Sequence, residues 1–145
     1  FNIGLAAIAF NGSMVLGRLI GDRLKEIFGI YNFLVFSVIG SFVGSIFIAS
    51  SSSLLFAIIG FVIAGFCVSS IIPICYTFGA SIKNLNPTVG ITIITIGTYG
   101  VFMIAPPTLG YVADIFGIEY VYTPMLILFL LISIIVIFQK KLFKN

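Results

Sequence analysis

The sequence predicts an all-α integral membrane protein. Hydrophobic residues make up 61% of the 145 residues and charged residues only 8%, and the mean hydropathy is +1.31. A soluble domain carries about 25% charged residues, so these few charged side chains are too sparse to cover a soluble core. The apolar residues also form continuous runs of about 20, the length of a membrane-spanning helix. They do not alternate in polarity, as the strands of a membrane barrel do.

Five apolar runs predict five transmembrane helices, at about residues 2–20, 31–49, 54–78, 88–112 and 121–138. Turn-forming residues separate the runs. Gly29 follows the first run, and Ser50 to Ser53 form a polar hairpin after the second. Asn86-Pro87 supplies a cap and a first-turn proline for the fourth helix, and Thr123-Pro124 resembles such a start for the fifth. We therefore expect one helical bundle.

The positive charges predict an orientation in the membrane. If the spans alternate, one side receives all seven cations, namely Arg18, Arg23, Lys25, Lys83, Lys140, Lys141 and Lys144. The other side receives the serine turn and residues 113–119, which hold Asp114 and Glu119. The positive-inside rule then places the cations and the C-terminus in the cytoplasm. The first helix starts outside, and this odd count of spans predicts further helices upstream, so we interpret the chain as a fragment.

The residue types argue against enzymatic or nucleic-acid chemistry. The sequence has no His, no ligand cluster with the spacing of a metal site and no acid–base pair within the spans. The cations lie in three small groups and not in one basic patch. Cys67 and Cys75 lie about 12 Å apart along a helix, which is too far for a disulfide. We expect no enzyme activity, no metal, no cofactor and no nucleic-acid partner.

Polar side chains inside the spans mark candidate cavity positions. Thr88, Thr92, Thr95 and Tyr99 recur on one face of the fourth helix, and a polar stripe in lipid faces protein or water. With two polar groups of other spans, the candidate cavity-lining residues are Asn11, Tyr76, Thr92, Thr95 and Tyr99. The alternative is structural: threonine hydroxyls bond to the preceding turn, and Asn11 joins two helices.

Prolines and small residues predict breaks and close packing. Pro73 lies inside the third span and Pro106-Pro107 inside the fourth, where each ring removes a helical hydrogen bond and clashes with the carbonyl four residues back. Such breaks suit either a moving, ligand-lining helix or a static kink. The segment 37-SVIGSFVGS-45 repeats small residues every fourth position, which favours close helix packing.

The stretch 16-LGRLIGDRLKEIFG-29 concentrates five charged residues in nine positions. Arg18 and Asp22 are four residues apart on the emerging helix and can form an ion pair. Gly17 and Gly21 leave room for another helix to cross at that level. An ion pair at a close crossing predicts a latch.

Two motifs resemble the major facilitator superfamily. The segment 17-GRLIGDRL-24 is similar to its signature loop in the G-R-x-x-G-D-R form. The segment 97-GTYGVFMIAPPTLGYVADIFG-117 is similar to the G-Y-x-G…P-P…G-F/Y pattern of the eleventh helix in a bacterial branch often called sugar or drug permeases. The resemblance covers the whole chain as the eighth to twelfth helices of a twelve-helix transporter. It implies that the chain forms most of the C-terminal six-helix half, without one further helix and the N-terminal half.

The resemblance implies transport of a small molecule by alternating access across the bacterial inner membrane. The family assigns a cytoplasmic gating motif to Gly17, Arg18, Gly21, Asp22 and Arg23, in which Asp22 pairs with the positive end of a helix in the opposite half. The partners would be the lipid bilayer, the missing N-terminal half and a sugar or drug-like substrate.

The family also lines its cavity with the eighth, tenth and eleventh helices and keeps the ninth and twelfth at the periphery. The chain departs from the family pattern after Arg23, where Leu24, Lys25 and Glu26 replace a basic run. The alternative function is a structural or assembly subunit of a membrane complex that transports nothing itself.

Overall fold

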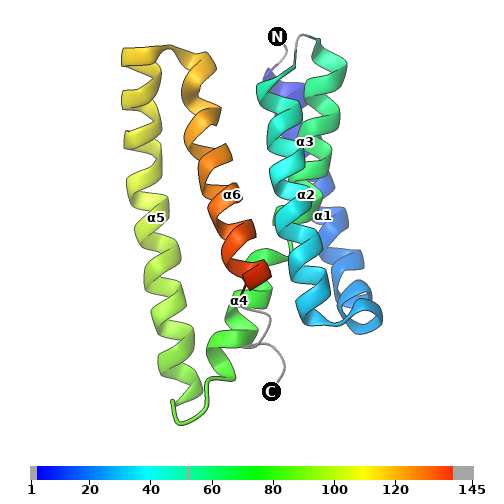
Figure 1. Cartoon of the computed structure of the whole chain (residues 1–145), viewed down its shortest axis with the longest axis vertical. Coiled ribbons are helices and arrows are strands. Elements are labelled where there is room, and N and C mark those ends of the chain that lie inside the picture. Colours follow the sequence, from blue (N-terminus) through cyan, green and yellow to red (C-terminus); the bar gives the residue numbers. More distant parts are fainter. Residues whose placement is uncertain (1–2, 52, 139–145) are drawn as a thin grey trace. The chain divides into compact units, whose positions relative to one another are not determined.

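A computed structural model describes residues 3–51 and 53–138, and all regular structure in these ranges is helical. The elements in chain order are α1 (Ile3–Phe28), α2 (Ile30–Ala49), α3 (Leu54–Val68), α4 (Ile71–Ala80), α5 (Pro87–Phe116), the short 3₁₀ helix η1 (Ile118–Val121) and α6 (Tyr122–Phe138) (Figure 1). The expected all-α class is confirmed. Lys140, Lys141 and Lys144, which support the predicted orientation, lie outside the described residues.

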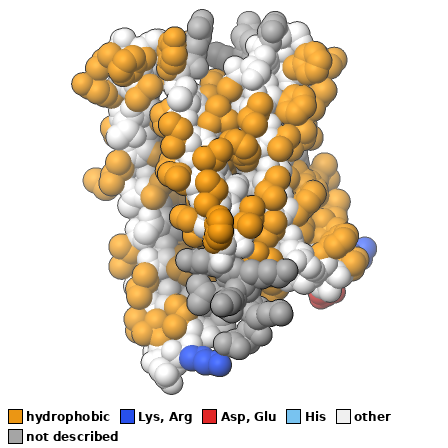
Figure 2. Space-filling view, in the orientation of Figure 1, with side chains coloured by type: hydrophobic (Ala, Val, Ile, Leu, Met, Phe, Trp, Pro, Cys, Tyr) orange, Lys and Arg blue, Asp and Glu red, His pale blue; other side chains and the backbone are white. Residues whose placement is uncertain are grey.

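Four helical segments of the described chain are long and apolar enough to cross a membrane. They are Gly4–Phe28, Ile30–Ala49, Leu54–Ala80 and Pro87–Phe116, where the third runs through both α3 and α4. The apolar helix α6 is shorter, with 17 residues. On the face shown in Figure 2, hydrophobic side chains are spread along the helices and charged side chains are few. The chain is therefore an integral membrane protein.

The helix α1 continues well beyond the predicted end of the first span. The expected limit was residue 20, whereas α1 ends at Phe28 and takes the whole charged stretch into its last turns. Residues 18–28 contain no glycine or proline besides Gly21, and Leu, Arg, Lys and Glu are good helix formers. Gly29 then stops the helix with a φ of 80°, and its N–H donates to the carbonyl of Lys25 at 3.0 Å.

The chain divides into two compact units. The first comprises residues 1–71 and 122–145, and the second comprises residues 72–121. Within the first unit, α3 packs against both α1 and α2, and α6 packs against α2. The Tyr31 hydroxyl donates to the carbonyls of Val136 at 3.3 Å and Ile137 at 3.4 Å. These bonds hold the end of α6 beside the start of α2.

The crossing of α2 and α3 depends on small residues. A Cβ atom on Gly44 would lie 2.7 Å from the backbone nitrogen of Ala64, and one on Gly60 would lie 2.9 Å from the carbonyl oxygen of Gly44. Two serines of α2 turn their hydroxyls onto their own helix, since Ser41 donates to the carbonyl of Ser37 at 2.7 Å and Ser45 donates to the carbonyl of Ser41 at 2.8 Å. The predicted small-residue packing face is confirmed.

The second unit contains the α4–α5 hairpin and η1. Helix α4 meets α5 near the start of α5, and η1 contacts α5. Asn86 caps α5, because its side-chain oxygen accepts a hydrogen bond from the Thr88 N–H at 3.0 Å, and Pro87 occupies the first turn. Gly79 of α4 meets Gly90 of α5 backbone to backbone, with no space for a Cβ on either residue. Beyond Gly117, η1 contacts the end of α5.

Candidate functional site: the charged end of α1

The two glycines of the charged stretch lie where α1 crosses α3. A Cβ on Gly17 would clash with the Ser69 hydroxyl and would come within 2.6 Å of the Phe66 carbonyl oxygen. A Cβ on Gly21 would lie 2.6 Å from the Ser70 hydroxyl. Both glycines are buried. The sequence suggested that another helix crosses at this level, and that helix is α3.

The transmembrane segment α3–α4 is interrupted at this crossing. α3 ends at Val68, Ser69 and Ser70 form a turn, and α4 begins at Ile71. The interruption therefore lies before Pro73 and not at it. Proline at position 73 cannot donate to the carbonyl of Ser69, and its ring crowds that carbonyl. The ladder fails one turn upstream of the proline, at the two serines.

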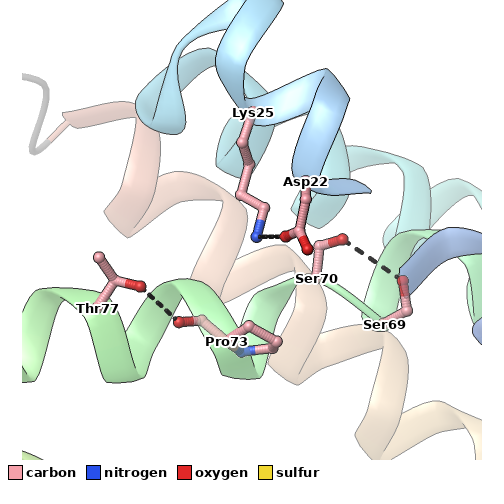
Figure 3. A network of polar contacts seen from close by, with 6 residues as sticks. All are labelled: Asp22, Lys25, Ser69, Ser70, Pro73 and Thr77. Atoms are coloured by element: carbon pink, nitrogen blue, oxygen red, sulfur yellow. Dashed lines mark hydrogen bonds and ion pairs between the residues drawn. The ribbon is translucent and has the colours of Figure 1, made fainter. Parts of the chain in front are cut away.

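Side-chain hydroxyls satisfy backbone carbonyls around the interruption. The Ser69 hydroxyl donates to the Phe66 carbonyl at 2.7 Å and lies 3.5 Å from the Ser70 hydroxyl (Figure 3). The Thr77 hydroxyl donates to the carbonyl of Pro73 at 3.0 Å. Ser69 and Ser70 are both 3% exposed. Sequence inspection missed these serines, although a small polar pair one turn before a proline is the signal that marks them.

The carboxylate of Asp22 pairs with a different cation from the one expected. The sequence suggested Arg18, but Lys25 Nζ lies 2.6 Å from Asp22 Oδ1 (Figure 3). Arg18 lies about one turn before Asp22 and Lys25 about one turn after it, so both cations are within reach of the carboxylate. The Asp22 side chain is 81% exposed, and an exposed pair of this kind contributes about 1 kcal/mol or less to stability. Asp22 therefore presents its charge at the helix end.

The helix α5 is not interrupted by its double proline. Pro106 and Pro107 lie inside one helix that runs to Phe116, so the expected break is not found there. The Thr108 hydroxyl donates to the carbonyls of Ile104 at 3.0 Å and Ala105 at 2.9 Å. Such side-chain bonds allow prolines to be accommodated in membrane helices.

The threonine stripe of α5 bonds mainly to its own helix. Thr92 donates to the carbonyl of Thr88 at 2.8 Å and Thr95 to that of Ile91 at 2.9 Å. This is the structural alternative for these residues. Thr95 also lies 3.4 Å from the hydroxyl of Tyr76 on α4. The candidate cavity residues Tyr76 and Thr95 are therefore brought together within the second unit.

The remaining candidates are exposed. Tyr99 is 69% exposed on α5. Asn11 lies on α1 in the first unit, where its Nδ2 donates to the carbonyl of Ala7 at 2.8 Å. This bond stays within one helix, so the alternative of a bond between helices is not found for Asn11. No group of three or more potential metal-ligating side chains occurs among the described residues.

Known proteins similar to this chain are membrane proteins. The membrane protein MosC of Rhizobium meliloti is 29% identical over 120 residues, which cover 79% of this chain and 28% of MosC. An uncharacterized MFS-type transporter of Yersinia pestis is 28% identical over 130 residues, which cover 90% of this chain and 34% of that protein. The chain thus spans about a third of the length of these relatives.

No sequence profile of a known protein family matches the chain, and no solved structure matches it. The similarity to an MFS-type transporter is distant but extends over most of the chain.

Proposed function

We propose that the chain is part of the C-terminal half of a major facilitator superfamily transporter and that the whole protein moves a small molecule by alternating access. The distant similarity to an MFS-type transporter supports this function. The four long apolar helices and the stretch 17-GRLIGDRL-24 agree with it. Apolar helix walls with a few hydroxyl groups suit a neutral sugar or an amphipathic drug.

The proposed gate is the charged end of α1, formed by Gly17, Arg18, Gly21, Asp22 and Arg23. The close contact of Gly17 and Gly21 with the interrupted α3–α4 segment carries the proposal. This contact joins the charged motif to the helix interruption at Ser69 and Ser70, which two continuous helices would not have. The exposed Asp22 carboxylate can exchange Lys25 for the positive end of a helix in the other half of the transporter, because its present ion pair is weak.

The proposed substrate contacts belong to the α4–α5 hairpin and to α1. Tyr76 and Thr95 place two hydroxyl groups side by side, and each retains acceptor capacity for a substrate hydroxyl. Thr92 and Tyr99 continue the same stripe along α5, and Asn11 is the candidate on α1. The protein lies in the bacterial inner membrane with the end of α1 and the C-terminus in the cytoplasm.

Replacement of Asp22 tests the gate in the full-length protein that contains this chain. We expect Asp22→Asn to lower the initial rate of uptake by about tenfold, the effect of losing one charge-assisted hydrogen bond, while the amount of protein in the membrane stays unchanged. Glu26→Gln is the matched control, since it removes an exposed acid from the same helix end and should retain uptake. Equal uptake by wild type and Asp22→Asn would refute the gate.

A further inference from the structure

Lys25 continues the buried face of α1 beyond the two glycines of the charged stretch. Gly17, Gly21 and Lys25 are spaced four residues apart, so they lie on one stripe of the helix. Both glycines meet α3 or the serine turn that follows it. The Lys25 side chain is only 20% exposed, although it lies in the last turn of α1. Its ammonium group is therefore held in place by the covered stem of the side chain.

Lys25 and Asp22 differ sharply in exposure. Lys25 Nζ lies 2.6 Å from Asp22 Oδ1 (Figure 3), and the Asp22 side chain is 81% exposed. The cation is thus the fixed partner of this pair, whereas the carboxylate has room to turn elsewhere. Arg18 lies about as close to Asp22 along the helix, but it is exposed and forms no ion pair with the described residues. Lys25 is therefore the cation that occupies Asp22.

The pair with Lys25 opposes the contact that the proposed gate requires. In that gate, Asp22 binds the positive end of a helix in the other half of the transporter, and such an end carries about half a unit of charge. The Lys25 ammonium carries a full unit charge, so it neutralises the carboxylate and repels a second positive group that comes close. One exposed carboxylate therefore has two positive partners that compete for it.

We propose that Lys25 regulates the gate: by holding Asp22, it favours the arrangement in which the cytoplasmic side is open. This role rests on the proposed function. Lys25 acts through Asp22 and not on a substrate, which makes it a positioning residue. Because an exposed ion pair is weak, Lys25 shifts the balance between the open and closed arrangements by about twofold to fivefold and locks neither of them.

The reactivity of a cysteine in the proposed path measures how often the cytoplasmic side is open. The reporter is Tyr99→Cys in the full-length protein that contains this chain, with Cys67 and Cys75 replaced by alanine. Inside-out membrane vesicles present the cytoplasmic side to a membrane-impermeant maleimide, and no substrate is needed. We expect Lys25→Gln to slow labelling by up to about fivefold, because Asp22 then binds the other half more often.

Lys25→Arg is the matched control, because arginine keeps a positive charge beside Asp22, and it should be labelled at the wild-type rate. Asp22→Asn should speed labelling, since it weakens the closed arrangement. In the Asp22→Asn background, Lys25→Gln should have no further effect, because the carboxylate that Lys25 holds is gone. Arg18→Gln removes a cation that is not paired with Asp22, and its effect should not depend on Asp22 in this way.

The outcomes separate the role of Lys25 from the proposed function. A slowing by Lys25→Gln that persists in the Asp22→Asn background would overturn the role, because it would indicate a packing effect of the covered stem. Unchanged labelling in Lys25→Gln would also overturn it, and the proposed gate would stand if Asp22→Asn still speeds labelling. Unchanged labelling in Asp22→Asn would reject the gate and the role of Lys25 together. Absence of labelling at Tyr99→Cys in every variant would reject the water-filled path, on which both depend.

Discussion

The absence of a side chain at Gly17 allows α1 to contact α3 through its backbone. The neighbouring atoms are a carbonyl oxygen and a buried serine hydroxyl, and the carbonyl cannot move without moving the helix that carries it. Gly12, on the same helix, has no atom within 4 Å of the place where its Cβ would lie. The two glycines have the same sequence context of an apolar helix but different structural importance.

We expect Gly17→Ala to destabilise the protein by about 1–3 kcal/mol, because the added methyl group forces α1 away from α3. Gly12→Ala should leave stability unchanged or raise it by up to about 1 kcal/mol, since alanine favours the helix. Thermal unfolding of the two variants in the same detergent measures the difference. Equal midpoints for both variants would contradict the close contact at Gly17.

At the residue scale, the sequence predicted the crossing but not the partner of Asp22. Small residues one turn apart on a membrane helix favour close approach, and Gly17 and Gly21 fit this, although Gly97 and Gly100 of α5 are one turn apart and have no atom within 4 Å of their Cβ positions. Arg18 and Lys25 are both one turn from Asp22. Spacing alone cannot choose between them, because side-chain rotamers and the packing of Lys25, which is only 20% exposed, decide the pair.

At the element scale, the same residue type has opposite effects in two helices. Pro73 is associated with an interruption at Ser69 and Ser70, while Pro106 and Pro107 lie within a continuous α5. Proline alone does not separate these cases, whereas the small polar pair Ser69-Ser70 precedes only Pro73. The interruption coincides with the α1 crossing and with two small hydroxyl side chains, whereas the α5 prolines are exposed. Packing against a neighbour is what distinguishes the two sites.

Pro73→Ala should restore the missing N–H and allow it to bond to the carbonyl of Ser69, which makes α3 and α4 more continuous. We expect amide hydrogen exchange in residues 70–75 to slow by up to about tenfold. Pro106→Ala is the control and should change exchange around residue 102 much less, because α5 is already one helix. Unchanged exchange in Pro73→Ala would show that the serines, and not the proline, cause the interruption.

The predicted limit of a helix is close to the observed limit where a residue that starts or stops helices marks the boundary. The expected range 31–49 nearly coincides with α2, and the Asn86-Pro87 start of α5 is as expected. The end of α1 lies beyond the predicted residue 20, because Lys, Arg and Glu are good helix formers and extend the helix past its apolar run. Apolar composition indicates which part of a helix lies in the membrane, whereas Gly29, with its positive φ, marks where helix α1 ends.

At the scale of the whole molecule, composition and apolar run length were sufficient for the class of protein. They could not provide the division into two units or the register of the helix crossings, which depend on contacts between residues far apart in the sequence. The orientation is a further prediction at this scale, since it follows from where the cations lie along the entire chain.

Cysteine labelling tests the orientation. In the full-length protein, a cysteine at Ser53 should react with a membrane-impermeant maleimide on intact cells, because the predicted orientation places the serine turn outside. A cysteine at Lys83 should react only after the cells are made permeable. Both positions are exposed, so burial does not limit either reaction. The reverse pattern would invert the predicted topology.

The central claim is that the polar stripe of the α4–α5 hairpin lines a water-filled path for a substrate. Thiol reactivity tests it most directly, because a cysteine reacts as a thiolate and thiolates form in contact with water. Thr95→Cys and Tyr99→Cys are compared with Leu131→Cys on the apolar helix α6, in a protein whose Cys67 and Cys75 are replaced by alanine. A transporter predicts reaction with a water-soluble maleimide about tenfold faster at Thr95 and Tyr99 than at Leu131. Equal, slow reaction at all three positions would contradict the path and favour a structural subunit.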